Sequence, residues 1–246
     1  MEIHIYKDND VLSRAAAEWI TSYIGETLQG QDRFTWVLSG GNTPRGLYEL
    51  LAAPPYLEKI QWNKIHVFWG DERVVPFDDP RNNAKMAYDI LLNHVPVPSS
   101  QIHIMRTDIT PEKSASDYDQ ILHQYFRNAE GSSSASFDLV LLGMGEDGHT
   151  LSLFPGTEVV HESQAWVKAF YLQSQEMHRI TLTKTIVNRS RAVAFLTTGS
   201  NKSKALRQVL EGPSDPDLYP SQVIQPQTGH LYWFVDEAAA AGLSKQ

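Results

Sequence analysis

The chain has 246 residues, 41% of them hydrophobic and 20% charged, and its 21 Lys and Arg against 29 Asp and Glu give a net charge of −8. This is the composition of a globular protein with a sizeable core, and the acidic balance argues against nucleic acid or an anionic membrane as the main partner. Cysteine is absent, which excludes disulfides, thiolate metal sites and a cysteine nucleophile, and fits a cytoplasmic location. The N-terminus lacks the pattern of a signal peptide, and the apolar runs are too short to span a bilayer.

Short apolar runs alternate along the chain with segments of helical periodicity. In chain order they predict a strand at Glu2–Tyr6, a helix at Val11–Leu28, a strand at Phe34–Ser39, a helix at Arg45–Ala53, a strand at Ile65–Trp69, a helix at Ala84–Leu92, a strand at Ile102–Met105, a helix at Glu112–Asn128, strands at Phe137–Leu142, Trp166–Tyr171 and Ala192–Thr197, a helix at Lys202–Leu210 and a strand at Leu231–Val235. This alternation predicts an α/β fold, a three-layer Rossmann-like sandwich with a mainly parallel central sheet. Residues 130–136 and 212–220 are predicted surface connections, and we expect a single domain over residues 1–246.

A glycine pair follows the second predicted strand, in the segment Ser39-Gly40-Gly41-Asn42-Thr43-Pro44. Thr43 can cap a helix that begins at Pro44. Glycines before a helix leave backbone N–H groups exposed at its positive end, so the segment predicts a phosphate-binding turn. A tight turn without a ligand is an equally good interpretation of this stretch taken alone.

Charged residues follow the third predicted strand, in Gly70-Asp71-Glu72-Arg73. Ligands of open parallel sheets bind outside the carboxyl ends of the strands, so these side chains are candidates for a reaction centre and an anion site. The alternative is a structural cluster of Arg73 with the two carboxylates.

The run Gly143-Met-Gly145-Glu-Asp147-Gly148-His149 contains the spacing G-x-G-x-x-G after a strand. A dinucleotide-binding fingerprint requires a full helix behind the glycines, and Pro155-Gly156 interrupts this segment too early. The glycines instead bring Asp147 and His149 to a strand end, where an imidazole can accept a proton from water. Two cationic segments, around Arg179 and around Lys202 and Lys204, are candidates for phosphate contacts, with Lys204 better interpreted as a solvated helix residue.

Taken together, Leu38-Ser-Gly-Gly-Asn-Thr-Pro44, Gly70-Asp-Glu-Arg73, Gly143-Met-Gly-Glu-Asp-Gly-His-Thr150 and Ser152-Leu-Phe-Pro-Gly156 resemble the 6-phosphogluconolactonase family in order and spacing. Related glucosamine-6-phosphate deaminases typically have Tyr in place of Arg73 and Phe-Asn-Glu-Pro-Gly in place of Ser152-Leu-Phe-Pro-Gly156. The chain departs from the lactonase pattern at Asn42, usually Ser, and at Leu151, commonly Ala.

The resemblance implies a glucosamine-6-phosphate deaminase-like fold and hydrolysis of 6-phospho-D-glucono-1,5-lactone, the second step of the oxidative pentose phosphate pathway. It implies a small phosphosugar substrate and neither cofactor nor metal, and we see no evidence for an obligate protein partner. His149 is then the general base and Asp147 its orienting partner, with Arg73 near the carbonyl or the phosphate. The implied substrate-binding residues are Gly40, Gly41, Asn42, Thr43, Asp71, Arg179 and Lys202.

Two alternatives remain open. An isomerase or deaminase would use Asp71 as the base that removes a proton from carbon. A non-catalytic sugar-phosphate sensor would not need Asp147 and His149 together, so their presence counts against it.

Overall fold

The computed structural model describes residues 1–126 and 136–244. Within these ranges, one parallel sheet contains six strands, in the spatial order β1 (Glu2–Tyr6), β9 (His230–Asp236), β8 (Ala192–Thr197), β5 (Leu139–Gly143), β2 (Phe34–Leu38) and β3 (Ile65–Trp69). A smaller antiparallel sheet is formed by β4 (Asp71–Arg73), β7 (Met177–Leu182) and β6 (Val167–Leu172).

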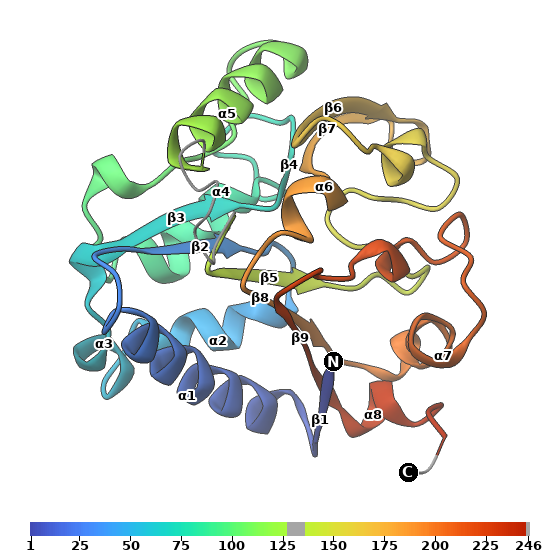
Figure 1. Ribbon diagram of the computed structural model, residues 1–246, viewed down its shortest axis with the longest axis horizontal. Helices are drawn as coiled ribbons and strands as arrows, with labels where there is room; N and C mark the ends of the chain where they lie inside the picture. The colour runs from blue at the N-terminus through green and yellow to red at the C-terminus, as the bar shows by residue number, and fades with distance from the viewer. Residues whose placement is uncertain (127–135, 245–246) are drawn as a thin grey trace.

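Helices cover both faces of the parallel sheet (Figure 1). One face packs against α1 (Asn9–Thr27), α2 (Thr43–Leu51), α3 (Tyr56–Lys59) and α4 (Asn83–Ala87). The other packs against α5 (Pro111–Phe126), α6 (Lys184–Val187), α7 (Ser203–Glu211), α8 (Glu237–Ala240) and the small sheet. The strand β5 is buried on both faces, with Leu139 and Leu141 in the first core and Val140 and Leu142 in the second. The three-layer, mainly parallel α/β architecture confirms the fold predicted from the sequence.

The direction of chain progression through the sheet reverses between β2 and β5. From β2 the chain continues outward to β3, whereas from β5 it continues the other way to β8 and β9. Such a reversal leaves a crevice at the carboxyl ends of the two central strands, which is where open α/β sheets bind ligands. The predicted glycine turn follows β2, and the His149 segment follows β5.

The prediction of a strand at Ile102–Met105 is wrong. Ile102 forms a single isolated bridge with Val67, and the chain then leaves the sheet after the hydrogen bond from His103 N–H to the Val67 carbonyl (2.9 Å). The run is too short to continue the ladder. The predicted strand Trp166–Tyr171 is found as β6, but it pairs antiparallel with β7, because only a short turn separates the two and a parallel crossover needs a dozen residues or more.

Helix boundaries differ by a few residues from those predicted. The predicted helix at Ala84–Leu92 is α4 followed by a π-helical turn at Tyr88–Leu92. Helix α5 is described to Phe126, so the predicted end of this helix at Asn128 lies outside the described residues. Of the predicted surface connection over residues 130–136 only Ser136 is described, and it is buried.

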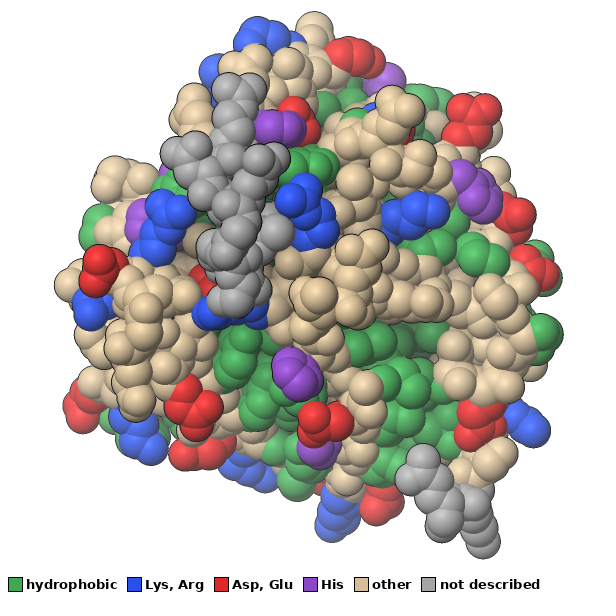
Figure 2. Space-filling view, viewed as in Figure 1, with side chains coloured by type: hydrophobic (Ala, Val, Ile, Leu, Met, Phe, Trp, Pro, Cys, Tyr) green, Lys and Arg blue, Asp and Glu red, His purple; other side chains and the backbone are tan. Residues whose placement is uncertain are grey.

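Hydrophobic side chains gather on the lower half of the face in Figure 2, near the N-terminus, and a small cavity of about 180 Å³ there is lined by Met1, Leu210, Leu231 and Trp233 among others.

Among residues 1–126 and 136–244, we find no helix with the length and hydropathy needed to cross a bilayer.

Candidate active site

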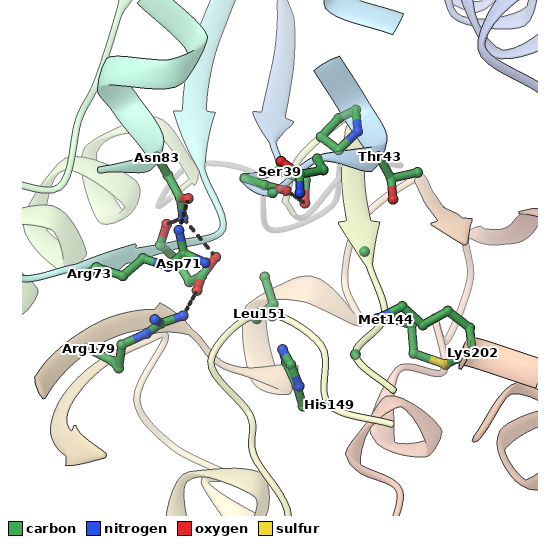
Figure 3. A pocket seen from close by; sticks show the side chains of 16 residues that line it. Ser39, Thr43, Asp71, Arg73, Asn83, Met144, His149, Leu151, Arg179 and Lys202 are labelled. Atoms are coloured by element: carbon green, nitrogen blue, oxygen red, sulfur yellow. Dashed lines mark hydrogen bonds and ion pairs between the residues drawn. The ribbon is translucent and has the colours of Figure 1, made fainter. Parts of the chain in front are cut away.

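A pocket of about 200 Å³ opens at the carboxyl ends of the central strands (Figure 3). It is lined by residues at or after the ends of β2, β5 and β8, together with residues of β4 and β7 and the first residue of α4. The lining consists of Ser39, Gly40, Gly41, Asn42, Thr43, Pro44, Asp71, Arg73, Asn83, Gly143, Met144, Gly145, His149, Leu151, Arg179 and Lys202. Nine of the residues predicted from the sequence therefore meet at one place, although they come from five separate segments of the chain. These nine are Gly40, Gly41, Asn42, Thr43, Asp71, Arg73, His149, Arg179 and Lys202.

The glycine turn places the N-terminus of α2 at the pocket. Gly41 has φ +89°, a left-handed conformation that glycine adopts without strain. A Cβ on Gly40 would lie 1.9 Å from Asn83 Oδ1, so only glycine permits this close approach. Helix α2 begins at Thr43 with Asn42 as its N-cap residue, one position earlier than predicted. The prediction that Thr43 caps the helix is therefore wrong, and its hydroxyl lies 3.3 Å from that of Thr198.

His149 and Asp147 form a hydrogen-bonded pair beside the pocket. His149 Nδ1 is 2.5 Å from Asp147 Oδ1, and the His149 N–H also donates to that oxygen (3.1 Å). Burial raises the pKa of the Asp147 carboxyl, but the hydrogen bonds and charge of His149 outweigh this effect and leave it below its usual value. The carboxylate favours the tautomer with a proton on Nδ1, which leaves Nε2 as the proton acceptor.

Two neighbours fix this pair. A Cβ on Gly145 would lie 2.1 Å from His149 Nδ1, so a larger residue would displace the imidazole. On its other side the imidazole stacks on the Phe154 ring, with 4.1 Å between ring centroids. The same ring lies 5.6 Å from the guanidinium carbon of Arg179.

Arg179 and Asp71 form an ion pair in the wall of the pocket, with Nη2 and Oδ2 3.0 Å apart and side chains 3% and 12% exposed. Burial lowers the pKa of Arg179, and the Asp71 charge partly offsets this. Ser152, a fully buried residue, lies between them: its hydroxyl donates to Asp71 Oδ2 (2.6 Å) and accepts from Arg179 Nε (2.8 Å).

Arg73 and Asn83 form a second fixed group on the same wall. Arg73 Nη1 donates to the Arg81 carbonyl and to Asn83 Oδ1, both at 2.9 Å. Asn83 Nδ2 in turn donates to the Asp71 carbonyl (2.9 Å). Glu72 is outside the pocket lining and accepts hydrogen bonds from three backbone N–H groups. Glu72 therefore supports the backbone of Arg73 and Asn83, in keeping with the structural cluster considered for these charged residues, and it does not line the pocket.

Sequence reasoning missed Asn83, Ser152 and Phe154. Asn83 follows a loop with no motif, and Ser152 and Phe154 were used only to distinguish families. Leu151, one of the two departures from the lactonase pattern, lines the pocket from a left-handed backbone conformation with φ 54°.

Three permanent cations and one carboxylate line this pocket within the described residues, so it is locally basic in an acidic protein. Together with the helix N-terminus, this favours an anionic ligand. Among residues 1–126 and 136–244, no group of three or more His, Asp or Glu side chains is placed to hold a metal ion.

Comparison with known proteins agrees with this chemistry. Residues 7–233 match the family described as glucosamine-6-phosphate isomerases/6-phosphogluconolactonase. A 6-phosphogluconolactonase from a Nostoc strain is 41% identical over 243 residues, covering 98% of both chains. The solved structure of 6-phosphogluconolactonase from Trypanosoma cruzi is 26% identical with a TM-score of 0.85, covering 99% of this chain and 97% of that one. A monomeric glucosamine-6-phosphate deaminase, 21% identical with a TM-score of 0.83 over 98% of this chain and all of that one, shares the fold.

Proposed function

Because the chain belongs to the glucosamine-6-phosphate isomerase/6-phosphogluconolactonase family, we propose that it hydrolyses 6-phospho-D-glucono-1,5-lactone to 6-phospho-D-gluconate. The observation that carries this proposal is the His149–Asp147 pair at the edge of a basic pocket. Lactone hydrolysis requires an activated water, a group that stabilises the oxyanion and a binding site for the remote phosphate, and the pocket offers a candidate for each.

His149 is the proposed general base. Its Nε2 takes a proton from water as the water oxygen attacks the lactone carbonyl carbon. The tetrahedral intermediate then collapses, the bond to the ring oxygen breaks, and the imidazolium returns the proton to that oxygen, which becomes a hydroxyl. Asp147 holds the imidazole in the correct tautomer and stabilises its transient positive charge.

Arg73 is the group we assign to the negative charge that develops on the carbonyl oxygen. Its Nη1 atom is held by the Arg81 carbonyl and Asn83 Oδ1, so the guanidinium is fixed in advance. A charge positioned before the reaction stabilises the transition state without reorganisation at the moment of reaction.

The phosphate is proposed to bind at the N-terminus of α2, between the turn Gly40–Thr43 and Lys202. Binding the phosphate there fixes the remote end of the substrate. Its binding energy then helps to orient the carbonyl toward the attacking water.

The proposal is tested by acid release from freshly generated 6-phosphogluconolactone, after subtraction of the spontaneous rate, beside an ammonia assay on glucosamine 6-phosphate. We expect a large catalysed excess of acid and no ammonia. Ammonia without excess acid would identify a deaminase. No catalysed reaction in either assay, with 6-phosphogluconate still bound, would identify a sensor.

Replacing Lys202 by alanine is expected to raise KM about tenfold with kcat little changed, because a charge-assisted hydrogen bond to the phosphate is lost. Lys204, two residues further and exposed, provides the matched control. Steady-state kinetics of both variants measures the difference. Equal KM values for Lys202→Ala and wild type would remove Lys202 from the phosphate site.

Replacing Phe154 by leucine is expected to lower kcat by about two- to tenfold, because the imidazole loses its stacking partner while the core keeps an apolar side chain of similar size. The thermal unfolding midpoint, measured in parallel, separates this local effect from destabilisation. An unchanged kcat would mean that Asp147 alone orients His149.

A further inference from the structure

Ser152 is buried between two pocket residues that come from other parts of the chain. It follows the His149 segment, whereas Asp71 belongs to β4 and Arg179 to β7. Its backbone N–H donates to Thr181 Oγ1 (3.2 Å), which fixes the residue against β7. The hydroxyl is thereby placed to use both of its functions, donating to Asp71 Oδ2 and accepting from Arg179 Nε.

The two carboxylate oxygens of Asp71 therefore differ in the hydrogen bonds that they accept. Oδ2 accepts from the Ser152 hydroxyl at 2.6 Å and from Arg179 Nη2 at 3.0 Å, which uses its two lone pairs. Oδ1 has only a long contact of 3.4 Å from Asn83 Nδ2 among the described residues. Since Asp71 lines the pocket, Oδ1 is the oxygen that can still accept a hydrogen bond from a ligand.

The hydrogen bonds of Arg179 likewise favour a role in holding Asp71 in place. Its guanidinium donates to Ser152, to Asp71 and to Gln175 Oε1 (3.2 Å), so at least three of its five N–H groups are used within the protein. Pairing with this cation also reduces the repulsion that a bare carboxylate would exert on an anionic substrate. The ion pair thus allows an acceptor to be kept inside a pocket that binds phosphate.

We propose that Ser152 is a positioning residue that locks Asp71 against Arg179 and leaves Asp71 Oδ1 facing the pocket as the acceptor for a hydroxyl group of the sugar. This inference rests on the proposed function, because it takes a polyhydroxylated sugar phosphate as the ligand. It separates two parts of recognition: the glycine turn and Lys202 bind the phosphate, and the Ser152–Asp71–Arg179 group binds the sugar.

The test compares a ligand that has sugar hydroxyls with one that has none. Dissociation constants of 6-phosphogluconate and inhibition constants of inorganic phosphate are measured for the wild type, Ser152→Ala and the exposed control Ser163→Ala. For Ser152→Ala we expect roughly tenfold weaker binding of 6-phosphogluconate and unchanged inhibition by phosphate. Ser163→Ala should match the wild type for both ligands.

Equal weakening of both ligands would overturn the proposal, because Ser152 would then act on the phosphate through Arg179. Unchanged binding of both would overturn it as well. Asp71→Asn provides a second variant if Ser152→Ala does not fold. It also removes a negative charge beside Arg179, which favours every anion, so the expected result is weaker binding of 6-phosphogluconate relative to that of phosphate. An unchanged ratio of the two constants in Asp71→Asn would exclude Oδ1 as the acceptor. Failure of the wild type to bind 6-phosphogluconate would count against the proposed function and not against the role of Ser152.

Discussion

Replacing His149 by alanine is expected to lower kcat by about 10²- to 10⁴-fold while 6-phosphogluconate binding stays within about threefold of wild type. The imidazole is the proposed proton acceptor, and none of the groups assigned to the phosphate or the sugar contacts it through a hydrogen bond within the described residues. Removing it should therefore raise the barrier of the chemical step and leave ground-state binding nearly unchanged. Initial rates on fresh lactone, together with calorimetric binding of 6-phosphogluconate, measure the two quantities separately.

The chain contains a matched control for this variant. His161 and Asp217 form a second His–Asp pair, 2.7 Å apart, with both side chains more than half exposed and outside the pocket lining. His161→Ala should retain wild-type kcat. Full activity in His149→Ala would exclude His149 as the base, and comparable losses in both variants would mean that the effect is not specific to the site.

The sequence allowed the fold and most of the pocket to be predicted because both depend on local patterns. Strands and helices alternate with clear periods, and parallel strands bring their carboxyl ends to one edge of the sheet. Gly40 and Asp71 lie two residues after the ends of β2 and β3, and His149 lies six residues after the end of β5, so their convergence required only the strand order.

The remaining contacts could not be predicted, because they join segments far apart in the chain. The hydrogen bond between Ser152 and Asp71 spans 81 residues, and the ion pair between Arg179 and Asp71 spans 108. The sequence suggested Arg179 as a phosphate ligand, whereas its position in the fold commits most of its donors to protein groups. Ser152 and Phe154 distinguished two families in the sequence, but only the fold indicates what these side chains contact.

Two carboxylates in this protein each accept hydrogen bonds from three backbone N–H groups, but one is buried and the other lies at the surface. Glu72 accepts from the backbone N–H groups of Arg73, Asn83 and Ala84 and is 1% exposed. Glu162 accepts from those of Ser163, Gln164 and Ala165 at the surface. Burial raises the pKa of Glu72 to about 7 despite its three amide donors. The amides of Ala165 and Gln164, with Lys168, lower the pKa of Glu162 to about 2.

These opposite shifts give opposite dependences of stability on pH. Between about pH 4.5 and 7 the folded state keeps a proton on Glu72 that the unfolded state has released, so this contribution to stability is present below pH 4.5 and is lost as the pH rises through 7. For Glu162 the folded state releases its proton first, so its contribution is present above pH 4.5 and is lost as the pH falls toward 2.

Glu72→Gln is therefore expected to remove a decrease in stability that the wild type shows on going from pH 5 to pH 8. The difference in unfolding free energy between wild type and variant should fall over this range by up to about 3 kcal/mol, the free energy that corresponds to the full pKa shift. Urea unfolding at several pH values measures it, and Glu162→Gln should show no such decrease. Because Glu72 holds the backbone of both Arg73 and Asn83, this titration would act on the wall of the pocket itself. A pH-independent difference would mean that the three amide donors outweigh burial and keep Glu72 ionised in the folded protein.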